Sequence, residues 1–286
     1  MSAKSVKLVS GRRRRRTARI AALGAVMVAG LGSAHAADVA ESFLRGAFAP
    51  PTEFKAYNNW EGPYIGVDLG RSFMSADMSD SASQLIENML RNATVQDQGN
   101  ISSWPSLNGS ASGNVWGGFV GYNWQQLSGI VLGIEGGYHM MSGDFSAVDK
   151  DNIRRVINLN GTNNDVTIKS GSRFTIKDYA TMRGRVGYVM GQFLPYAGLG
   201  VSVARVSYHT HVSVGVSQNN GPTIPFNSVI DKDNAVAYGA NLSLGADVIL
   251  LPNLFLRGEW EYIAFAKVEG IRADMNTFRV GLGLKF

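Results

Sequence analysis

Apolar side chains alternate with small or polar ones through most of the chain from Trp60 onward. A period of two residues is the pattern of β-strands whose two faces meet different surroundings. In the first such segment, Ile65 and Val67 lie on one face, and Gly66 and Asp68 lie on the other. Eight segments of this kind are predicted, at residues 64–73, 114–124, 130–140, 173–190, 194–208, 235–250, 254–265 and 276–286.

The connections between these segments alternate in length. Residues 125–129, 191–193 and 251–253 form tight turns, residues 266–275 form a connection of moderate length, and the other three connections are long and polar. Each segment is long enough to cross a bilayer when tilted. Short turns at one end and long loops at the other are typical of outer-membrane barrels. The pattern predicts an all-β fold, an eight-stranded antiparallel up-and-down transmembrane β-barrel with short periplasmic turns and long extracellular loops. The long connections are residues 74–113, 141–172 and 209–234.

A soluble, lipocalin-like barrel would show the same alternation, so the composition of the two faces has to distinguish a soluble barrel from a membrane-spanning one. The chain holds 34 glycines, and the polar face is rich in them and carries charges of both signs, which suits a narrow interior. The other face is broadly apolar, and its aromatic residues gather toward the strand ends, as interfacial belts do. A membrane-spanning barrel is therefore favoured. The belts are predicted to contain Tyr64, Trp124, Tyr188 and Phe286 near the short turns, and Trp116, Tyr138, Tyr238, Trp260, Tyr262 and Phe278 near the loops.

The basic charge of the chain comes from its first 36 residues. The formal net charge is +5, but residues 1–36 contain eight of the 27 Lys and Arg residues and no acid, which leaves 19 bases against 22 acids. An apolar stretch from Ile20 to Leu31 and the small-residue site Ala34-His35-Ala36 follow the basic run, as in a secretory signal peptide. We therefore expect no nucleic-acid partner. The predicted divisions are a signal peptide at 1–36, a periplasmic linker at 37–59 and the barrel at 60–286.

The small-residue site predicts cleavage after Ala36, so the exported protein is expected to begin at Ala37. N-terminal sequencing of protein purified from the cell envelope checks this. A mature chain that begins at Met1, or well away from Ala37, would contradict the assignment of a signal peptide.

The inward face of the predicted barrel carries five acids and five bases, a balance that predicts ion pairing. Eight strands leave an interior that side chains can fill, so we expect salt bridges to plug it. A tight turn at 251–253 sets Asp247 opposite Arg257, and the connection at 266–275 sets Glu261 opposite Arg279, with a slip of two residues as the alternative. The predicted interior charges are Asp68, Glu135, Arg183, Arg185, Asp247, Arg257, Glu259, Glu261, Arg279 and Lys285.

Three local features are also predicted. A helix is expected at residues 83–91, where four apolar residues share one helical face. Asn160-Gly161 has the residues of a tight hairpin turn, so residues 156–159 and 166–168 are expected to form a ribbon beyond the membrane. In the segment 173–190, unbroken alternation places Phe174, Ile176 and Met182 together on the outward face.

The stretch from Trp60 to Gly70 (WEGPYIGVDLG) and the closing stretch from Arg279 to Phe286 (RVGLGLKF) resemble the small outer-membrane barrel proteins of α-proteobacteria. These belong to the OmpA-like/opacity-type porin superfamily, and the resemblance covers residues 60–286. It implies an eight-stranded barrel that supports the envelope and is sometimes a surface antigen, while some relatives bind haem or are called porins. It also implies that Phe286 is the signal read by the barrel-assembly machinery.

No enzymatic activity and no cofactor are expected, because no nucleophile motif accompanies the few histidines. His209 and His211 share a strand face and are weak candidates for metal or haem ligands, with two solvated histidines the favoured interpretation. The expected role is structural and surface-exposed, in contact with outer-membrane lipids, lipopolysaccharide and the barrel-assembly machinery. The alternatives are a small porin-like diffusion channel and a haem or ligand receptor, and the sequence does not specify an oligomeric state.

Overall fold

The computed structural model describes residues 59–91, 93–142 and 145–286. The predicted signal peptide, its cleavage site and all of the predicted linker except residue 59 lie outside these residues. Within them the secondary structure is dominated by antiparallel strands. The strands are β1 (Gly62–Asp77), β2 (Asn108–Gln125), β3 (Ile130–Ser142), β4 (Ser146–Leu159), β5 (Thr162–Tyr188), β6 (Phe193–Gln218), β7 (Ile224–Leu251), β8 (Leu254–Phe265) and β9 (Arg272–Lys285), and the helices are α1 (Ser79–Met89), α2 (Thr94–Asp97) and the 3₁₀ helix η1 (Ile101–Ser103).

Eight of these strands form a closed antiparallel ring, which confirms the predicted barrel. The hydrogen-bonded order is β3-β2-β1-β9-β8-β7-β6-β5, and the pairing of β3 with β5 closes the ring. The apolar rows predicted for the outward face are exposed, with Val67 66% and Leu199 68% accessible, whereas alternate residues point into the barrel. Closure leaves no unpaired strand edge around the ring, which a bilayer core requires.

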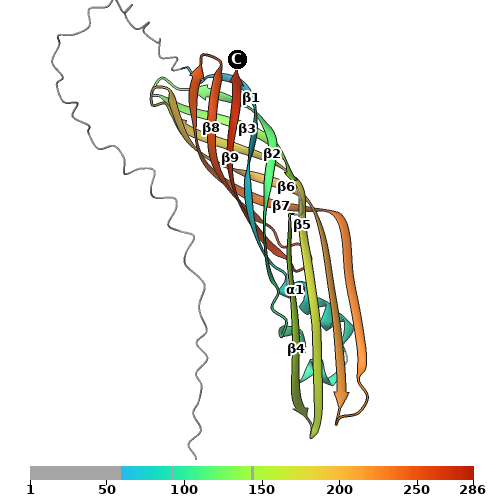
Figure 1. The fold of residues 1–286 in the computed structure, drawn as a ribbon. Coiled ribbons are helices and arrows are strands. Elements are labelled where there is room, and N and C mark those ends of the chain that lie inside the picture. The colour runs from blue at the N-terminus through green and yellow to red at the C-terminus, as the bar shows by residue number, and fades with distance from the viewer. Residues whose placement is uncertain (1–58, 92, 143–144) are drawn as a thin grey trace, which may run out of the picture. The chain divides into compact units, whose positions relative to one another are not determined.

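Strand β4 lies outside the ring and belongs to a second structure at the long-loop end. It pairs with the outer half of β5, and the outer parts of β6 and β7 continue the sheet. We call residues 146–176 and 206–235 the outer ribbon; it extends beyond the ends of the neighbouring strands (Figure 1). Residues 141–172 and 209–234 are long connections beyond the ring, as predicted, but most of their length is strand rather than irregular loop.

The hairpin at Asn160-Gly161 is confirmed. Leu159 pairs with Thr162, and the two residues between them have φ angles of 50° and 80°, the left-handed values that this tight turn needs. The ribbon predicted around it is present and is longer than predicted.

Helix α1 confirms the helix predicted at residues 83–91, although it begins earlier. Eleven residues make a marginal helix in isolation, so its buried side chains, among them Leu85 and Ile86, stabilise it against the inner face of the outer ribbon. The Lys267 ammonium donates to the Asp80 carboxylate at 2.7 Å, and this hydrogen bond lowers the pKa of Asp80. No helix among the described residues is long and apolar enough to cross a membrane.

A break in the alternation of β5 corrects one predicted face. The pairing of β5 with β6 shifts register between Ile176 and Asp178, as at a β-bulge. One extra residue reverses which side chains face inward, so Phe174 and Ile176 are buried and Met182 is exposed. The prediction that all three share the outward face was wrong.

Candidate functional site: a buried charge layer inside the barrel

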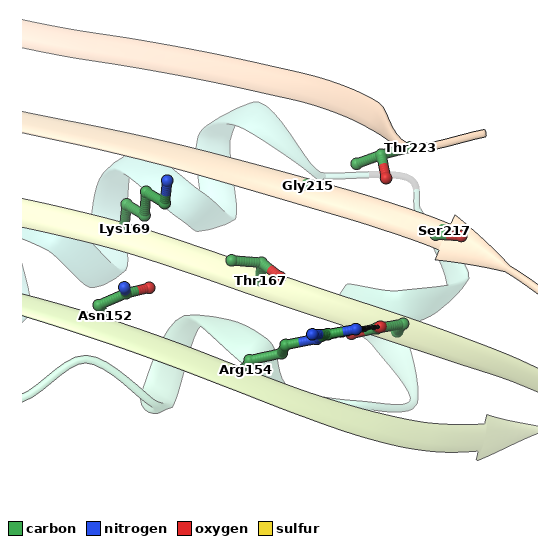
Figure 2. Close-up of a pocket in the computed structure, with 8 residues that line it drawn as sticks. Asn152, Arg154, Thr167, Lys169, Gly215, Ser217 and Thr223 are labelled. Atoms are coloured by element: carbon green, nitrogen blue, oxygen red, sulfur yellow. Dashed lines mark hydrogen bonds and ion pairs between the residues drawn. The ribbon is translucent and has the colours of Figure 1, made fainter. Parts of the chain in front are cut away.

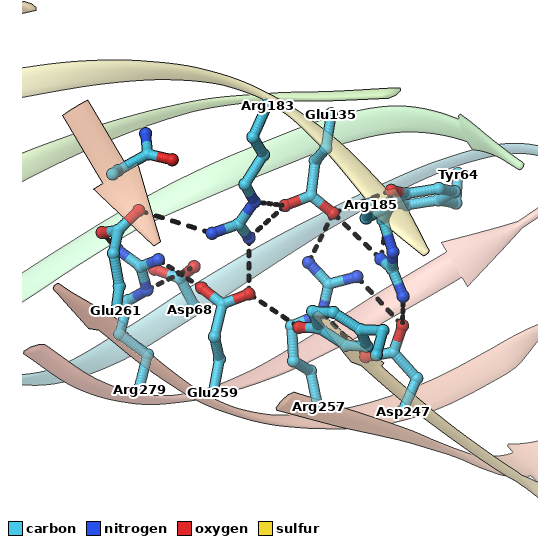
Figure 3. Close-up of polar contacts among 12 residues, drawn as sticks. Tyr64, Asp68, Glu135, Arg183, Arg185, Asp247, Arg257, Glu259, Glu261 and Arg279 are labelled. Carbon is cyan, nitrogen blue, oxygen red and sulfur yellow. Dashed lines mark hydrogen bonds and ion pairs between the residues drawn. The ribbon is translucent and has the colours of Figure 1, made fainter. Parts of the chain in front are cut away.

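Nine charged side chains meet inside the barrel, contributed by strands β1, β3, β5, β7, β8 and β9. The two-residue period of each strand turns them inward, and none exposes more than 7% of its surface. We call this group the charge layer (Figure 3). It consists of Asp68, Glu135, Arg183, Arg185, Asp247, Arg257, Glu259, Glu261 and Arg279.

Glu135 is the centre of one half of the layer. It accepts hydrogen bonds from Arg183, from Arg185 Nη1 at 3.2 Å and from Arg257 Nη1 at 2.6 Å. The Tyr64 hydroxyl donates to the same carboxylate at 2.8 Å. One carboxylate thus joins three guanidinium groups from two strands, an arrangement with the strength and geometric specificity of charge-assisted bonds.

Arg183 links that half to a second one. Its Nη2 donates to Glu259 at 2.5 Å, and its Nη1 lies 3.4 Å from the Glu261 carboxylate. Arg279 donates to Glu259 and, at 2.9 Å, to Glu261. The Tyr196 hydroxyl donates to Glu259 at 2.6 Å. The two halves therefore form one continuous network around the interior.

The register across two hairpins sets which charges face each other. Asp247 pairs directly with Arg257, as the tight turn predicts, and the carboxylate accepts from the Arg257 Nε at 2.8 Å. Arg279 pairs directly with Glu259, so the alternative with a slip of two residues is correct. Arg279 still reaches Glu261 diagonally, which cross-strand geometry allows for long side chains.

Asp68 and His139 occupy one side of the layer. His139 Nε2 lies 3.1 Å from the Asp68 carboxylate, and Arg279 Nε lies 3.6 Å from the same oxygen. The His139 ring stacks on Tyr179 with ring centroids 5.0 Å apart. This histidine is held as part of the interior packing.

Apolar clusters lie on both sides of the charge layer. On the short-turn side, Trp60, Phe119, Leu194, Ile249 and Phe255 are buried together with Tyr64 and Val131. On the long-loop side, a larger cluster continues from the barrel interior into the outer ribbon and under α1. The described interior is thus filled in three successive layers.

Two predicted locations need correction. Lys285 is half-buried and hydrogen-bonds the Asn59 carbonyl oxygen, which places it at the short-turn end, beside the apolar cluster rather than in the charge layer. Tyr64 was assigned to the outer aromatic belt, but it is 3% exposed and points into the barrel. It lies on the same strand face as Gly66 and Asp68, so the alternation itself indicated its direction.

The interior tyrosines are the functional residues that sequence reasoning missed. Tyr64, Tyr179 and Tyr196 place their hydroxyls against the carboxylates and guanidinium groups of the layer. Tyr196 shares a strand face with Gly198 and Gly200, which was a usable signal. Tyr179 follows the bulge in β5, and its direction could not be obtained from uninterrupted alternation.

The weak metal candidates lie elsewhere, on the outward face of the outer ribbon. The rings of His209 and His211 are exposed with centroids 6.0 Å apart, and His209 Nδ1 lies 3.5 Å from the Asp231 carboxylate. Across residues 59–91, 93–142 and 145–286, no group of three or more histidine, cysteine or acidic side chains is placed to hold a metal ion.

Comparison with known proteins places this architecture in a family. The model of a protein family described as "Outer membrane protein beta-barrel domain" matches residues 24–286. The chain is 26% identical over 266 residues to the 31 kDa outer-membrane immunogenic protein of Brucella melitensis biotype 1, covering 89% of this chain and 94% of that protein. It is 24% identical over 240 residues to the 25 kDa outer-membrane immunogenic protein of Brucella ovis, covering 82% of this chain and 83% of that protein.

Among solved structures, Neisserial surface protein A matches with a TM-score of 0.34 and 13% identity, over 79% of this chain and 97% of that one. OprG from Pseudomonas aeruginosa matches with a TM-score of 0.31 and 12% identity, over 79% and 96%. The family match includes every strand of the closed ring, so the chain belongs to the outer membrane protein beta-barrel family and is an outer-membrane protein.

Proposed function

We propose that this protein is a surface-exposed structural component of the outer membrane whose barrel is closed to ions, and that it is not an enzyme. The charge layer, enclosed between two apolar clusters, carries this proposal. An eight-stranded barrel is just wide enough for its side chains to fill it. Here those side chains are both large and mutually bonded.

The energetic cost of opening such an interior supports the same proposal. A hydrated ion would have to separate Glu135 and Glu259 from their arginine partners and then pass the ring of Phe255. Removing one partner from a buried ion pair typically costs about 3–5 kcal/mol. The rival function of a small diffusion channel needs a continuous water path through this filled interior. A haem receptor needs more iron ligands than the two exposed histidines, and no metal-holding group of histidine, cysteine or acidic side chains is found among the described residues.

Reconstitution of the folded protein into planar bilayers tests the proposal. We expect no steady single-channel openings beyond those of protein-free bilayers, because ions would have to displace the charge layer. Insertion is checked on the same sample by heat-modifiable migration on gels. Long-lived openings of uniform conductance with clear ion selectivity would establish the channel function instead.

We also propose that the barrel-assembly machinery recognises Phe286. This terminal side chain is 73% exposed, its backbone N–H donates to the Pro63 carbonyl oxygen at 3.0 Å, and it ends an outward apolar row. Deletion of Phe286 is expected to lower the yield of folded barrel in cells severely, while Phe286→Trp retains it. Refolding of the deleted chain in detergent serves as the control, because a loss of intrinsic stability would appear there too. Normal yield in cells after the deletion would exclude this role.

A further inference from the structure

Where the lipid-facing wall of the barrel meets the outer ribbon, the outward face changes abruptly from apolar to basic. On β6, Val201 and Val203 are exposed toward the lipid, and the next outward residue is Arg205. On β5, Met182 and Ala180 are followed by Lys177. The apolar band thus ends at a row of cations on both strands, at the level where lipid headgroups begin.

Three further cations lie beyond this row, on β4 and β5. Lys150 pairs across the strands with Gly171, and Lys169 and Arg173 lie two residues to either side of Gly171. All three side chains are exposed and point outward, and His211 pairs with Gly171 from the other side. We call Lys150, Lys169 and Arg173 the cationic patch. Lys150 is a diagonal neighbour of both Lys169 and Arg173, about 7–8 Å from each. Lys169 and Arg173 are roughly 13 Å apart along β5, so an extended anion with more than one charged group can contact all three.

The cationic patch differs from its surroundings in having no acidic partner. Arg205 pairs with Asp178, Lys177 lies 3.8 Å from Asp233, and Arg154 donates to Asp165 at 2.5 Å. In the part of the chain that the structure describes, Lys150, Lys169 and Arg173 form no ion pair. Neighbouring like charges repel, so this cluster is most stable when an external anion lies on it.

A polar pocket adjoins the patch on the same face. It has a volume of about 420 Å³, and Lys169 is one of its walls (Figure 2). The helices lie behind the strands in this view, so the pocket opens away from them. Hydroxyl and amide groups line most of the remainder, as suits the hydroxyls of a sugar. These residues are Asn152, Thr167, Ser217 and Thr223, and Gly215 and the Arg154–Asp165 ion pair complete the lining.

An apolar groove lies below the cations, in the lipid-facing surface of β6, β7 and β8. It has a volume of about 610 Å³ and is lined by Val201, Val203, Tyr238, Ala240 and Ala264, among others. Small alanine side chains between larger ones form a depression that suits an acyl chain. Strand β6 runs from this groove past Arg205 to His209, which pairs with Arg173 of the patch on the neighbouring strand β5.

We propose that this face binds an anionic glycolipid of the outer leaflet, a phosphorylated lipooligosaccharide or lipopolysaccharide. Its acyl chain lies in the groove, its phosphates contact Arg205 and the cationic patch, and its sugars enter the polar pocket. His209, which lies beside Arg173, is six residues further along β6 than Val203, a distance of roughly 20 Å along the strand. A single phosphodiester headgroup is too short for that span, whereas a phosphorylated oligosaccharide covers it. This site goes beyond the proposed structural role and does not depend on whether the barrel conducts.

The site is tested by measuring how purified lipopolysaccharide binds to the refolded full-length protein in neutral detergent micelles. Native mass spectrometry is the readout. The triple variant Lys150→Gln, Lys169→Gln, Arg173→Gln is expected to bind roughly 100-fold more weakly, at about five-fold per lost surface cation. Dephosphorylated lipopolysaccharide should bind wild type and variant equally weakly. Phosphatidylglycerol should bind wild type and the triple variant with similar affinity, because its headgroup does not reach the patch.

The matched control removes the same charge elsewhere: Arg71→Gln, Arg91→Gln, Arg272→Gln, at three exposed positions. This variant should bind lipopolysaccharide within a few-fold of wild type. Equal losses in both triple variants would mean that net charge alone attracts the lipid and would overturn the site. Unchanged binding in the patch variant would overturn it as well. If a soluble sulfated glycan binds as tightly as lipopolysaccharide, the acyl chain contributes nothing, and the proposal of a glycolipid ligand is overturned. Both variants are compared only as heat-modifiable, folded protein.

Discussion

Glu135→Gln is expected to lower the free energy of unfolding by about 3–5 kcal/mol, the typical cost of removing one partner from a buried charge network. The carboxylate accepts from Arg183, Arg185 and Arg257 together with the Tyr64 hydroxyl. Glutamine keeps the shape of the side chain but leaves three buried guanidinium groups without that negative charge. Urea unfolding of the barrel in lipid vesicles, followed by tryptophan fluorescence, measures the change.

The matched control for this substitution is Asp165→Asn. Asp165 forms a bidentate pair with Arg154, with Nε 3.0 Å from one carboxylate oxygen, but the Arg154 side chain is exposed. Surface ion pairs contribute little because water and salt screen them, so the unfolding midpoint should barely move. If the two substitutions cost the same, the interior is hydrated and the charge layer does not close the barrel.

Phe255→Ala is expected to cost about 3–5 kcal/mol, the usual range for deleting a buried aromatic ring. Phe255 is 2% exposed, and its ring lies 6.0 Å from each of the rings of Trp60 and Tyr64. The Arg257 guanidinium lies 5.6 Å from the same ring centroid. The same equilibrium unfolding assay measures the loss.

The contact between Gly283 and the Phe255 ring allows a more specific test of this prediction. It pairs directly with Phe255, and a Cβ at Gly283 would lie 2.1 Å from the Phe255 ring. Gly283→Leu should therefore destabilise the wild-type barrel and should partly restore stability to Phe255→Ala, because leucine fills the space that the ring leaves. Additive losses in the double variant would show that the ring does not cover this glycine.

The ring of strands and much of its interior could be predicted because strand faces follow directly from a two-residue period. Asp247 opposite Arg257 is the clearest case, since a tight turn fixes the register of its hairpin. The connection between β8 and β9 is longer, so sequence alone allowed two registers, and Arg279 faces Glu259 rather than Glu261.

The features that sequence did not indicate depend on tertiary contacts. The bulge before Asp178 inserts one residue, and this reverses the faces of Phe174 and Ile176. Nothing local marks that position. The outer ribbon was predicted only near Asn160-Gly161. Along β6 and β7 the outward residues are polar, as in a loop, and the inward apolar residues are buried only because α1 packs against them.

The continuity of the long-loop apolar cluster has a consequence for the order of assembly. Met74 of β1, Phe265 of β8 and Val214 of β6 belong to one cluster with Ile86 of α1. Strands far apart in the chain supply this core, so it cannot form before the barrel has closed. The part of the protein outside the membrane is then the last to become ordered during biogenesis and the first to open afterward. In pulsed hydrogen exchange during refolding, amides of α1 should gain protection later than those of β8 and β9.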